Sequence, residues 1–329
     1  MTVQITIIGL GQIGASMGLA LGQHKESILR VGHDKKINVE REAQKKGAID
    51  KTDHSLSSAV KDARLIVLSI PMSQVRETLE FIAPDLREGA LVLDTSPVKA
   101  EVVKWAKELL PEGRYYVGLV PAINPNHIHD LHLGLEAAQP DLFRKGVFII
   151  DAPYGTPGDA VTLVTDFVRL LGAAPLLADM TESDGLMAHT HILPQLVAAA
   201  LLNATLDQPG WREGRKLAGR AYAGVTAGLA YNDEINSLRM AALQNRANVV
   251  HSLDVMMAAL RGLRDDIDKL DDDSLAERLE AALEGREHWL NERMAADWIE
   301  ESRREMPNLP SFSERLFGGM FAKRTRPEK

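Results

Sequence analysis

The chain has 329 residues, of which 45% are hydrophobic, and a formal net charge of −8 at pH 7. This length accommodates two domains, and the acidic balance without a basic, aromatic-interleaved stripe argues against nucleic-acid binding. Cysteine is absent, which excludes disulfides, thiol catalysis and thiolate metal sites. The chain starts directly with an apolar strand, and no apolar run approaches the roughly 18 residues of a membrane span. We therefore expect a cytoplasmic protein with no membrane partner.

The first predicted elements are a strand over 3–8, a glycine loop and a helix over 12–21. The loop carries the pattern G-x-G-x-x-G, whose first glycine permits a tight turn. The second lets the backbone approach a pyrophosphate, and the third lets the helix pack closely on the strand. The N–H groups at the helix start also favour phosphate. We predict that the whole loop contacts a dinucleotide: Gly9, Leu10, Gly11, Gln12, Ile13 and Gly14.

A second apolar strand over 28–32 leads to Asp34, twenty residues after Gly14. A carboxylate at this position can accept both ribose hydroxyls of an adenosine and would repel a 2′-phosphate. This favours NAD as the cofactor, with Asp34 and Lys35 among its contacts. Lys36 adds a second cation, so binding of NADP stays open.

Continuous apolar strands then alternate with helices, which predicts a doubly wound parallel sheet covered on both faces. The strands are predicted at 65–70, 90–94, 115–120, 147–151 and 174–177, and the helices at 74–82, 98–110 and 158–171. At the strand ends, we expect the nicotinamide to contact Ser69, Ile70, Pro71, Thr95 and Ser96. We predict a Rossmann-type NAD-binding domain over 1–178.

The second half shows helical periods and no convincing strand, with helices predicted up to 206 and at 215–230, 234–268 and 274–301. An apolar stripe at helical spacing predicts a bundle core. Its residues are Leu238, Leu243, Val250, Leu253, Met257, Leu260 and Leu263. We predict a helical substrate and dimerisation domain over 179–305, a homodimer, and a basic tail over 306–329.

Six segments carry a resemblance to one known family: GLGQIGASMGLAL (9–21), VGHDKK (31–36), LIVLSIP (65–71), DTSPVK (94–99), GLEAAQPDLFRKG (134–146) and SDGLMAHTHILPQ (183–195). They resemble the prephenate and arogenate dehydrogenases of tyrosine biosynthesis. The resemblance implies a Rossmann-type domain, an all-helical dimerisation domain and NAD(P)-dependent oxidative decarboxylation. It extends over nearly the whole chain.

Three functional positions of that family differ here. Its catalytic histidine falls on Val120 or Asn124, its supporting serine on Pro97, and its substrate-binding arginine near Leu229. None of these side chains can act as a general base or a cation. The resemblance therefore implies a prephenate dehydrogenase-like oxidoreductase that moves hydride from a carbinol substrate to NAD. A dehydrogenase or reductase of a less anionic molecule, and a catalytically silent NAD-binding dimer, remain alternatives.

Three residues are candidates for the missing chemistry. Pro194 must bend the helix that carries His191 and leave a free carbonyl beside it, so His191 either orients or deprotonates the substrate or is a core histidine. Lys99 holds either a helix start or a substrate oxygen. Asn124 can hydrogen-bond the substrate but cannot take its proton.

Two further sets of residues are weaker candidates. His127, His129 and His132 offer a base, or they form a solvated loop, and we expect no metal there because only Asp130 joins them. If the substrate is prephenate, a cation such as Arg220 or Arg239 must meet its carboxylates. That role requires at least one of the two arginines to lie away from the outer surface.

Overall fold

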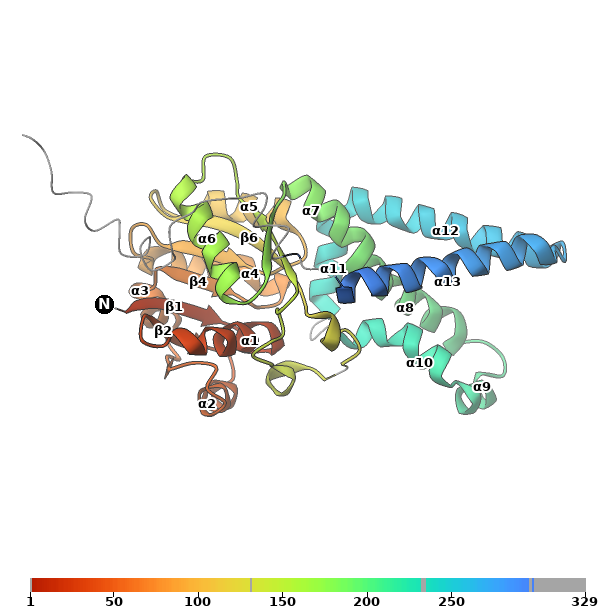
Figure 1. Ribbon diagram of the computed structural model, residues 1–329, viewed down its shortest axis with the longest axis horizontal. Helices are drawn as coiled ribbons and strands as arrows, with labels where there is room; N and C mark the ends of the chain where they lie inside the picture. The colour runs from red at the N-terminus through yellow and green to blue at the C-terminus, as the bar shows by residue number, and fades with distance from the viewer. Residues whose placement is uncertain (1, 131, 232–234, 296–297, 299–329) are drawn as a thin grey trace, which may run out of the picture. The chain divides into compact units, whose positions relative to one another are not determined.

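The computed structural model describes residues 2–130, 132–231, 235–295 and 298 (Figure 1). It divides between Ser183 and Asp184 into two compact units. The predicted basic tail over 306–329 lies outside the described residues. The two units are taken in turn below.

The first unit is built on an eight-stranded sheet in the order β3-β2-β1-β4-β5-β6-β7-β8. Its strands are β1 Val3–Ile8, β2 Ile28–His33, β3 Lys51–Thr52, β4 Leu65–Leu68, β5 Leu91–Asp94, β6 Tyr115–Ala122, β7 Val147–Asp151 and β8 Ala174–Leu177. The predicted doubly wound architecture is confirmed. The two-residue β3 was not predicted, because so short a strand leaves no hydrophobic run to detect.

One strand departs from the predicted parallel arrangement, because β7 runs antiparallel to β6. All other neighbours in the sheet pair in parallel. The described residues of the connection 123–146, which omit 131, form two short 3-10 turns, η3 Pro125–His127 and η4 Gly134–Ala137. A parallel strand requires a crossover connection, usually a helix. Because the described residues of this connection form no α-helix, the chain returns beside β6 in the opposite direction.

Helices cover both faces of this sheet. On one face, α1 Gln12–Leu21 and α6 Gly158–Leu170 pack into a continuous core with Ile5, Val67 and Leu93 from the strands. The other helices of the unit are α2 Ile37–Lys45, α3 Leu56–Lys61, α4 Met72–Ile82 and α5 Lys99–Leu109. The last three contact one another in series. Because β4 and β5 are buried along their whole length, they read as unbroken apolar runs.

An ion pair joins Arg30 of β2 to Asp50, which follows α2 in the chain. Arg30 is 4% exposed, and its guanidinium donates to both carboxylate oxygens of Asp50, at 2.9 and 2.5 Å. The remaining donors reach the carbonyl oxygens of Gly18 and Gly47 at 2.7 and 2.8 Å. This geometry satisfies the charge that burial would otherwise penalise.

All described elements of the second unit are helices. They are η5 Ala188–Ile192, α8 Leu193–Leu206, α9 Trp211–Leu217, α10 Arg220–Thr226, η6 Ala227–Tyr231, α11 Ile235–Gln244, α12 Arg246–Asp268 and α13 Asp272–Ala295, entered through α7 Met180–Met187. Two predicted helices are each split. Gly219 adopts an extended conformation before α10, and Asn245 leaves the helical region between α11 and α12. The buried Asn245 amide donates to the carbonyl oxygen of Asp184 at 2.6 Å.

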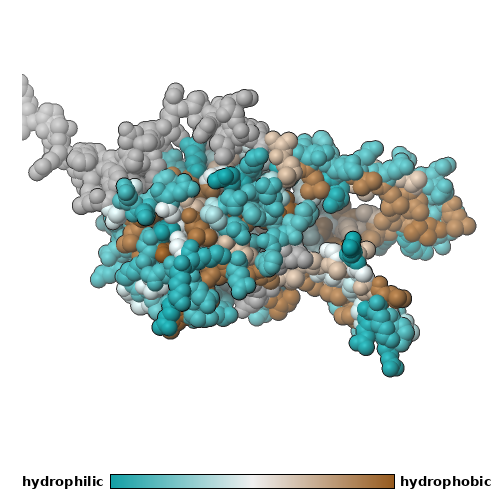
Figure 2. All heavy atoms as spheres, turned by 60° about the horizontal axis from the view of Figure 1, so that its bottom comes forward, coloured by the Kyte–Doolittle hydropathy of each residue, from teal (hydrophilic) through white to brown (hydrophobic). Residues whose placement is uncertain are grey.

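The predicted bundle core along α11 and α12 is wrong for most of its residues. Leu238 is 6% exposed, but Leu243, Val250, Met257 and Leu260 are between 47% and 62% exposed. Figure 2 shows apolar side chains gathered over this unit. Helical periodicity identifies an apolar face without saying what covers it.

The continuous helical segment Met180–Leu206 is long and apolar enough to cross a membrane by length and composition. This contradicts the expectation that no segment approaches that length. The reason is that the alanine- and leucine-rich α8 follows α7 and η5 without a break. The resemblance to a membrane span is weak, because buried polar residues, Asp184 and Gln195, lie along the same segment.

Candidate functional site

The predicted glycine loop lies where the sheet order reverses. The chain proceeds outward from β1 to β2 and β3, then starts again at β4 on the other side of β1. Backbone hydrogen bonds join the ends of these strands: Gly9 N donates to His33 O at 2.9 Å, and Ser69 N to Ile8 O at 2.8 Å. Open α/β sheets bind ligands outside the carboxyl ends of their strands at this switch point.

Each glycine of the loop has a different steric role. Gly9 has φ +90°, and a Cβ there would overlap the carbonyl oxygen of Ser69. A Cβ at Gly14 would overlap the carbonyl oxygen of Gly9, because α1 packs directly on the loop. A Cβ at Gly11 would have no heavy atom within 4 Å. The first and third glycines are therefore required by the fold, whereas the space beside the second is open to a ligand.

The start of α1 leaves backbone donors for such a ligand. Gly11 is its N-cap and supplies no side-chain cap, and no acidic residue stands in the first turn. The first N–H groups of a helix need partners from outside it, and its positive end attracts anions. Gln12 and Ile13 are half-buried at this position, and the Gln12 amide donates to the carbonyl oxygen of Ala137 at 3.5 Å.

Asp34 follows β2 and lies beside the glycine loop. Its Oδ2 accepts the N–H of Leu10 and its Oδ1 accepts the N–H of Lys36, both at 3.0 Å. Each carboxylate oxygen keeps a second lone pair, and the side chain is half-buried. The carboxylate is thus fixed in position and can still accept ribose hydroxyls. Lys35 is exposed.

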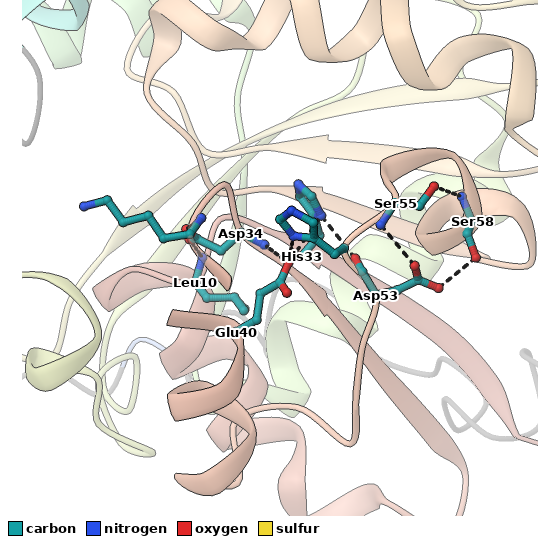
Figure 3. Close-up of polar contacts among 9 residues, drawn as sticks. Leu10, His33, Asp34, Glu40, Asp53, Ser55 and Ser58 are labelled. Atoms are coloured by element: carbon teal, nitrogen blue, oxygen red, sulfur yellow. Dashed lines mark hydrogen bonds and ion pairs between the residues drawn. The ribbon is translucent and has the colours of Figure 1, made fainter. Parts of the chain in front are cut away.

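Beside Asp34 lies a cluster that the sequence did not reveal (Figure 3). Glu40 Oε1 accepts the Asp34 N–H at 3.0 Å and lies 3.1 Å from Nδ1 of His54 and 3.5 Å from Nδ1 of His33. Glu40 is 2% exposed. The three residues come from β2, α2 and the loop after β3, with no regular spacing, so no motif could have predicted their contact.

The residues predicted to meet the nicotinamide lie at the ends of β4 and β5. Ser69, Ile70 and Pro71 are half-buried. Thr95 is also half-buried and donates its N–H to Leu68 O at 3.1 Å, whereas Ser96 is 3% exposed. These ends continue the row of strand ends that begins with β2 and β1.

Lys99 lies inside the protein, where it is 0% exposed. Its Nζ donates to Oδ2 of Asp94 at 2.7 Å and to the carbonyl oxygen of Asp94 at 3.0 Å. The Tyr116 hydroxyl donates to the same Oδ2 at 2.7 Å, and Oδ1 accepts the N–H of Ser96 at 2.7 Å. This arrangement corresponds to the structural alternative, in which Lys99 holds the start of α5 and the turn after β5.

The side chain of Asn124 also hydrogen-bonds to neighbouring backbone. It is 2% exposed, its side-chain oxygen accepts the N–H of Asn126, and its amide donates to the carbonyl oxygen of Asp141, both at 3.1 Å. Nearby, His127 Nε2 lies 3.1 Å from Asp141 Oδ1, and the exposed His132 lies 2.5 Å from Asp130. His129 is exposed. Two of the three loop histidines thus pair with different carboxylates.

His191 belongs to the π-helix η5 in the second unit. Pro194 cannot donate to the carbonyl of Thr190, and the neighbouring carbonyl of His191 accepts the side-chain amide of Gln195 at 2.8 Å. The π turn is the local distortion of the helix that precedes Pro194. The His191 side chain is exposed by surface area, yet desolvation by surrounding protein lowers its pKa below the ordinary 6.5. The lowered pKa favours the neutral imidazole, which is the form that accepts a proton.

The proposed substrate cations are corrected by the structure. Arg220 and Arg239 both have exposed side chains on the second unit, which contradicts the requirement that one lie away from its surface. At the three altered family positions, Val120 is 6% exposed and Pro97 and Leu229 are half-buried.

A cavity of about 250 Å³ lies at the opposite edge of the sheet from the glycine loop. Its walls include Arg114 and Tyr115 at the amino end of β6, and Pro153 and Tyr154 after β7. Because ligands of open α/β sheets bind at the carboxyl ends of the parallel strands, this cavity is not the predicted site.

Comparison with known proteins gives concordant matches. The model of the prephenate dehydrogenase nucleotide-binding domain matches residues 17–176. The chain is 28% identical over 202 residues to the prephenate dehydrogenase of Bacillus subtilis, which covers 61% of this chain but only 53% of that enzyme. It is 25% identical over 287 residues to the cyclohexadienyl dehydrogenase of Zymomonas mobilis, covering 86% of this chain and 94% of that enzyme.

A solved structure has the same fold. Prephenate dehydrogenase from A. aeolicus, in complex with hydroxyphenyl propionate and NAD⁺, superposes with a TM-score of 0.75 at 20% identity, over 88% of this chain and 98% of that one. The matches confirm the predicted nucleotide-binding domain and the predicted relationship. The two relatives are dehydrogenases, which supports the predicted NAD-dependent oxidoreductase.

Proposed function

Because the chain belongs to the prephenate dehydrogenase family, we propose that it is an NAD-dependent oxidoreductase that oxidises a small carbinol substrate. The observation that carries this proposal is the glycine loop at the switch point, with open space beside Gly11 and a fixed carboxylate at Asp34. The bound nicotinamide would supply the hydride acceptor. The chain's own residues would hold the pyrophosphate and the ribose.

NAD, rather than NADP, is the proposed cofactor. The Asp34 carboxylate is held by two backbone N–H groups at 3.0 Å, so it cannot easily swing away from a 2′-phosphate. A phosphate there would meet a fixed negative charge. Lys35 and Lys36 are exposed, which leaves room for weaker NADP binding.

Prephenate or arogenate is the leading substrate class, because two relatives of the chain are named for these substrates. The proposed proton acceptor is His191, because its lowered pKa favours the neutral form. Lys99 and Asn124 are proposed as positioning residues, since their polar atoms already bind neighbouring backbone and side chains. Because these hydrogen bonds already occupy Lys99 and Asn124, they also support the second candidate, a catalytically silent NAD-binding protein.

NADH formation tests this proposal. The purified chain at high concentration is mixed with NAD⁺ and either prephenate or arogenate, and NADH is followed by absorbance. NAD binding is measured by fluorescence in the same sample. We expect turnover that falls at least about a hundredfold in His191→Gln, the scale of general-base catalysis, and is unchanged in His251→Gln, an exposed histidine of the same unit. NAD binding without turnover on either substrate would favour the silent protein or a different substrate.

We also propose a cytoplasmic homodimer. Val250, Met257 and Leu260 recur at helical spacing along α12 and are 47–52% exposed, and a partner subunit would cover such an apolar face. The proposed domain roles follow: residues 1–178 bind NAD, and residues 179–305 bind substrate and dimerise.

A further inference from the structure

Three side chains of types that can bind metals meet at the β3 edge of the sheet in the first unit. His33 is the last residue of β2, Glu40 belongs to α2, and His54 follows β3. One donor atom from each lies within 4.8 Å of the other two. The centroids of the two imidazole rings are 5.6 Å apart, and the ring planes are tilted by 30°. Nδ1 of His33 also lies 3.1 Å from the carbonyl oxygen of Asp53. Figure 3 shows His33 and Glu40 directed toward each other.

Two residues of this cluster are buried and the third is exposed to solvent. Glu40 is 2% exposed and His33 is 9% exposed, whereas the side chain of His54 is 51% exposed. A buried carboxylate requires strong compensation. It receives one backbone N–H, from Asp34, and otherwise faces imidazole nitrogens. Two imidazoles and one carboxylate form the donor set that zinc and similar transition metals prefer, whereas calcium and magnesium prefer oxygen donors alone.

We propose that His33, Glu40 and His54 bind a divalent transition-metal ion of the zinc class. Metal–ligand bonds of about 2.0–2.2 Å require the donor atoms to approach more closely than 4.8 Å. The exposed His54 can make that movement and also leaves a path for the ion. Three protein donors leave a tetrahedral position for water. The sequence-based expectation of no metal considered only the loop histidines, and this site revises it.

The site is connected to the cofactor pocket through Asp34. Glu40 Oε1, a donor to the metal, accepts the Asp34 N–H, and the Asp34 carboxylate in turn accepts the Leu10 N–H of the glycine loop. An ion that fixes Glu40 therefore also fixes the ribose-binding carboxylate. This part rests on the proposed function: metal and NAD should each change the affinity of the other by the same factor.

Metal titration of the full chain tests the site without the cofactor. The protein is stripped with a chelator and titrated with Zn²⁺ by calorimetry and with Co²⁺ by visible absorption. We expect one ion to bind at least about tenfold more tightly to the parent than to His54→Gln, because losing a ligand should cost at least as much as losing an outer-shell partner. The matched control is His129→Gln, another exposed histidine of the first unit, and it should bind like the parent.

Equal affinity of the parent and His54→Gln, or no binding by the parent, would overturn the proposal. Glu40→Gln provides a second variant, with its folding checked by circular dichroism, and it should also lose the Co²⁺ spectrum. Failure of the dehydrogenase assay would leave the metal titration unchanged, so the two proposals fail separately. A repeat of the NAD titration with and without Zn²⁺ then measures the coupling.

Discussion

The substitution Gly11→Ala separates cofactor binding from folding. Gly11 has φ −72° and ψ −163°, which alanine adopts readily, and an added Cβ would have no protein atom within 4 Å. The apo protein should therefore be unchanged or more stable by about 0.4–1 kcal/mol, because alanine restricts the unfolded chain. The new methyl group occupies the space through which a pyrophosphate must approach the backbone.

The loss of NAD affinity can be estimated from that overlap. Forcing a methyl group into a well-packed contact costs about 1–3 kcal/mol, which corresponds to a dissociation constant about 5- to 150-fold higher. The assay is calorimetric titration with NAD⁺, accompanied by thermal unfolding of the apo protein. Gly158→Ala is the matched control, since Gly158 also lies at the start of a helix and a Cβ added there would have no heavy atom within 4 Å. Equal NAD affinity of Gly11→Ala and the parent would refute the assignment of the pyrophosphate to this loop.

Three further predictions concern stability and assembly. Arg30→Met removes the guanidinium from the Asp50 carboxylate, whose side chain is 28% exposed, and should lower the free energy of unfolding by about 1.5–3 kcal/mol. The measurement is urea denaturation, and a loss under about 1 kcal/mol would contradict the role given to the pair. Burial raises the pKa of Asp50, but hydrogen bonds from Arg30 outweigh it and lower the pKa below its ordinary 3.8. The pair's contribution should therefore be complete above pH 3.8 and lost as the pH falls through the lower folded value, so Asp50→Asn should reduce the acid dependence of unfolding, and an unaltered acid profile would count against it. Leu260→Glu places a charge on the exposed apolar face and should weaken dimerisation at least tenfold in light scattering, whereas a monomeric parent would exclude the dimer outright.

The sequence predicted the first unit best where one physical requirement selects one residue type. Gly9 and Gly14 are surrounded so closely that a Cβ would overlap backbone atoms. Only glycine fits such positions, so the sequence shows them as a motif. β4 and β5 are buried on both faces, which leaves an unbroken apolar run. The antiparallel direction of β7 was not predicted, because it depends on the connection before it, whose described residues form no α-helix.

The rest of the site depends on contacts between elements that no local pattern records. The sequence placed Lys99 at a helix start but could not show that Asp94 and Tyr116 surround it. Likewise, His33 and Glu40 carry no spacing that distinguishes them from a solvated strand end and a helix surface. Such partners become visible only when the sheet order brings them together.

The π-helix at 188–192 has a consequence for how the second unit could have arisen and could vary. A π turn holds one more residue than an α turn, so it is equivalent to a single-residue insertion tolerated inside a helix. Deleting one residue there would restore a regular α-helical turn and leave the later side chains of α8 on the faces they now occupy. In a regular α-helix, however, the ring of Pro194 would clash with the carbonyl four residues before it. The cost of such a deletion would therefore fall on the proline and not on the packing of α8.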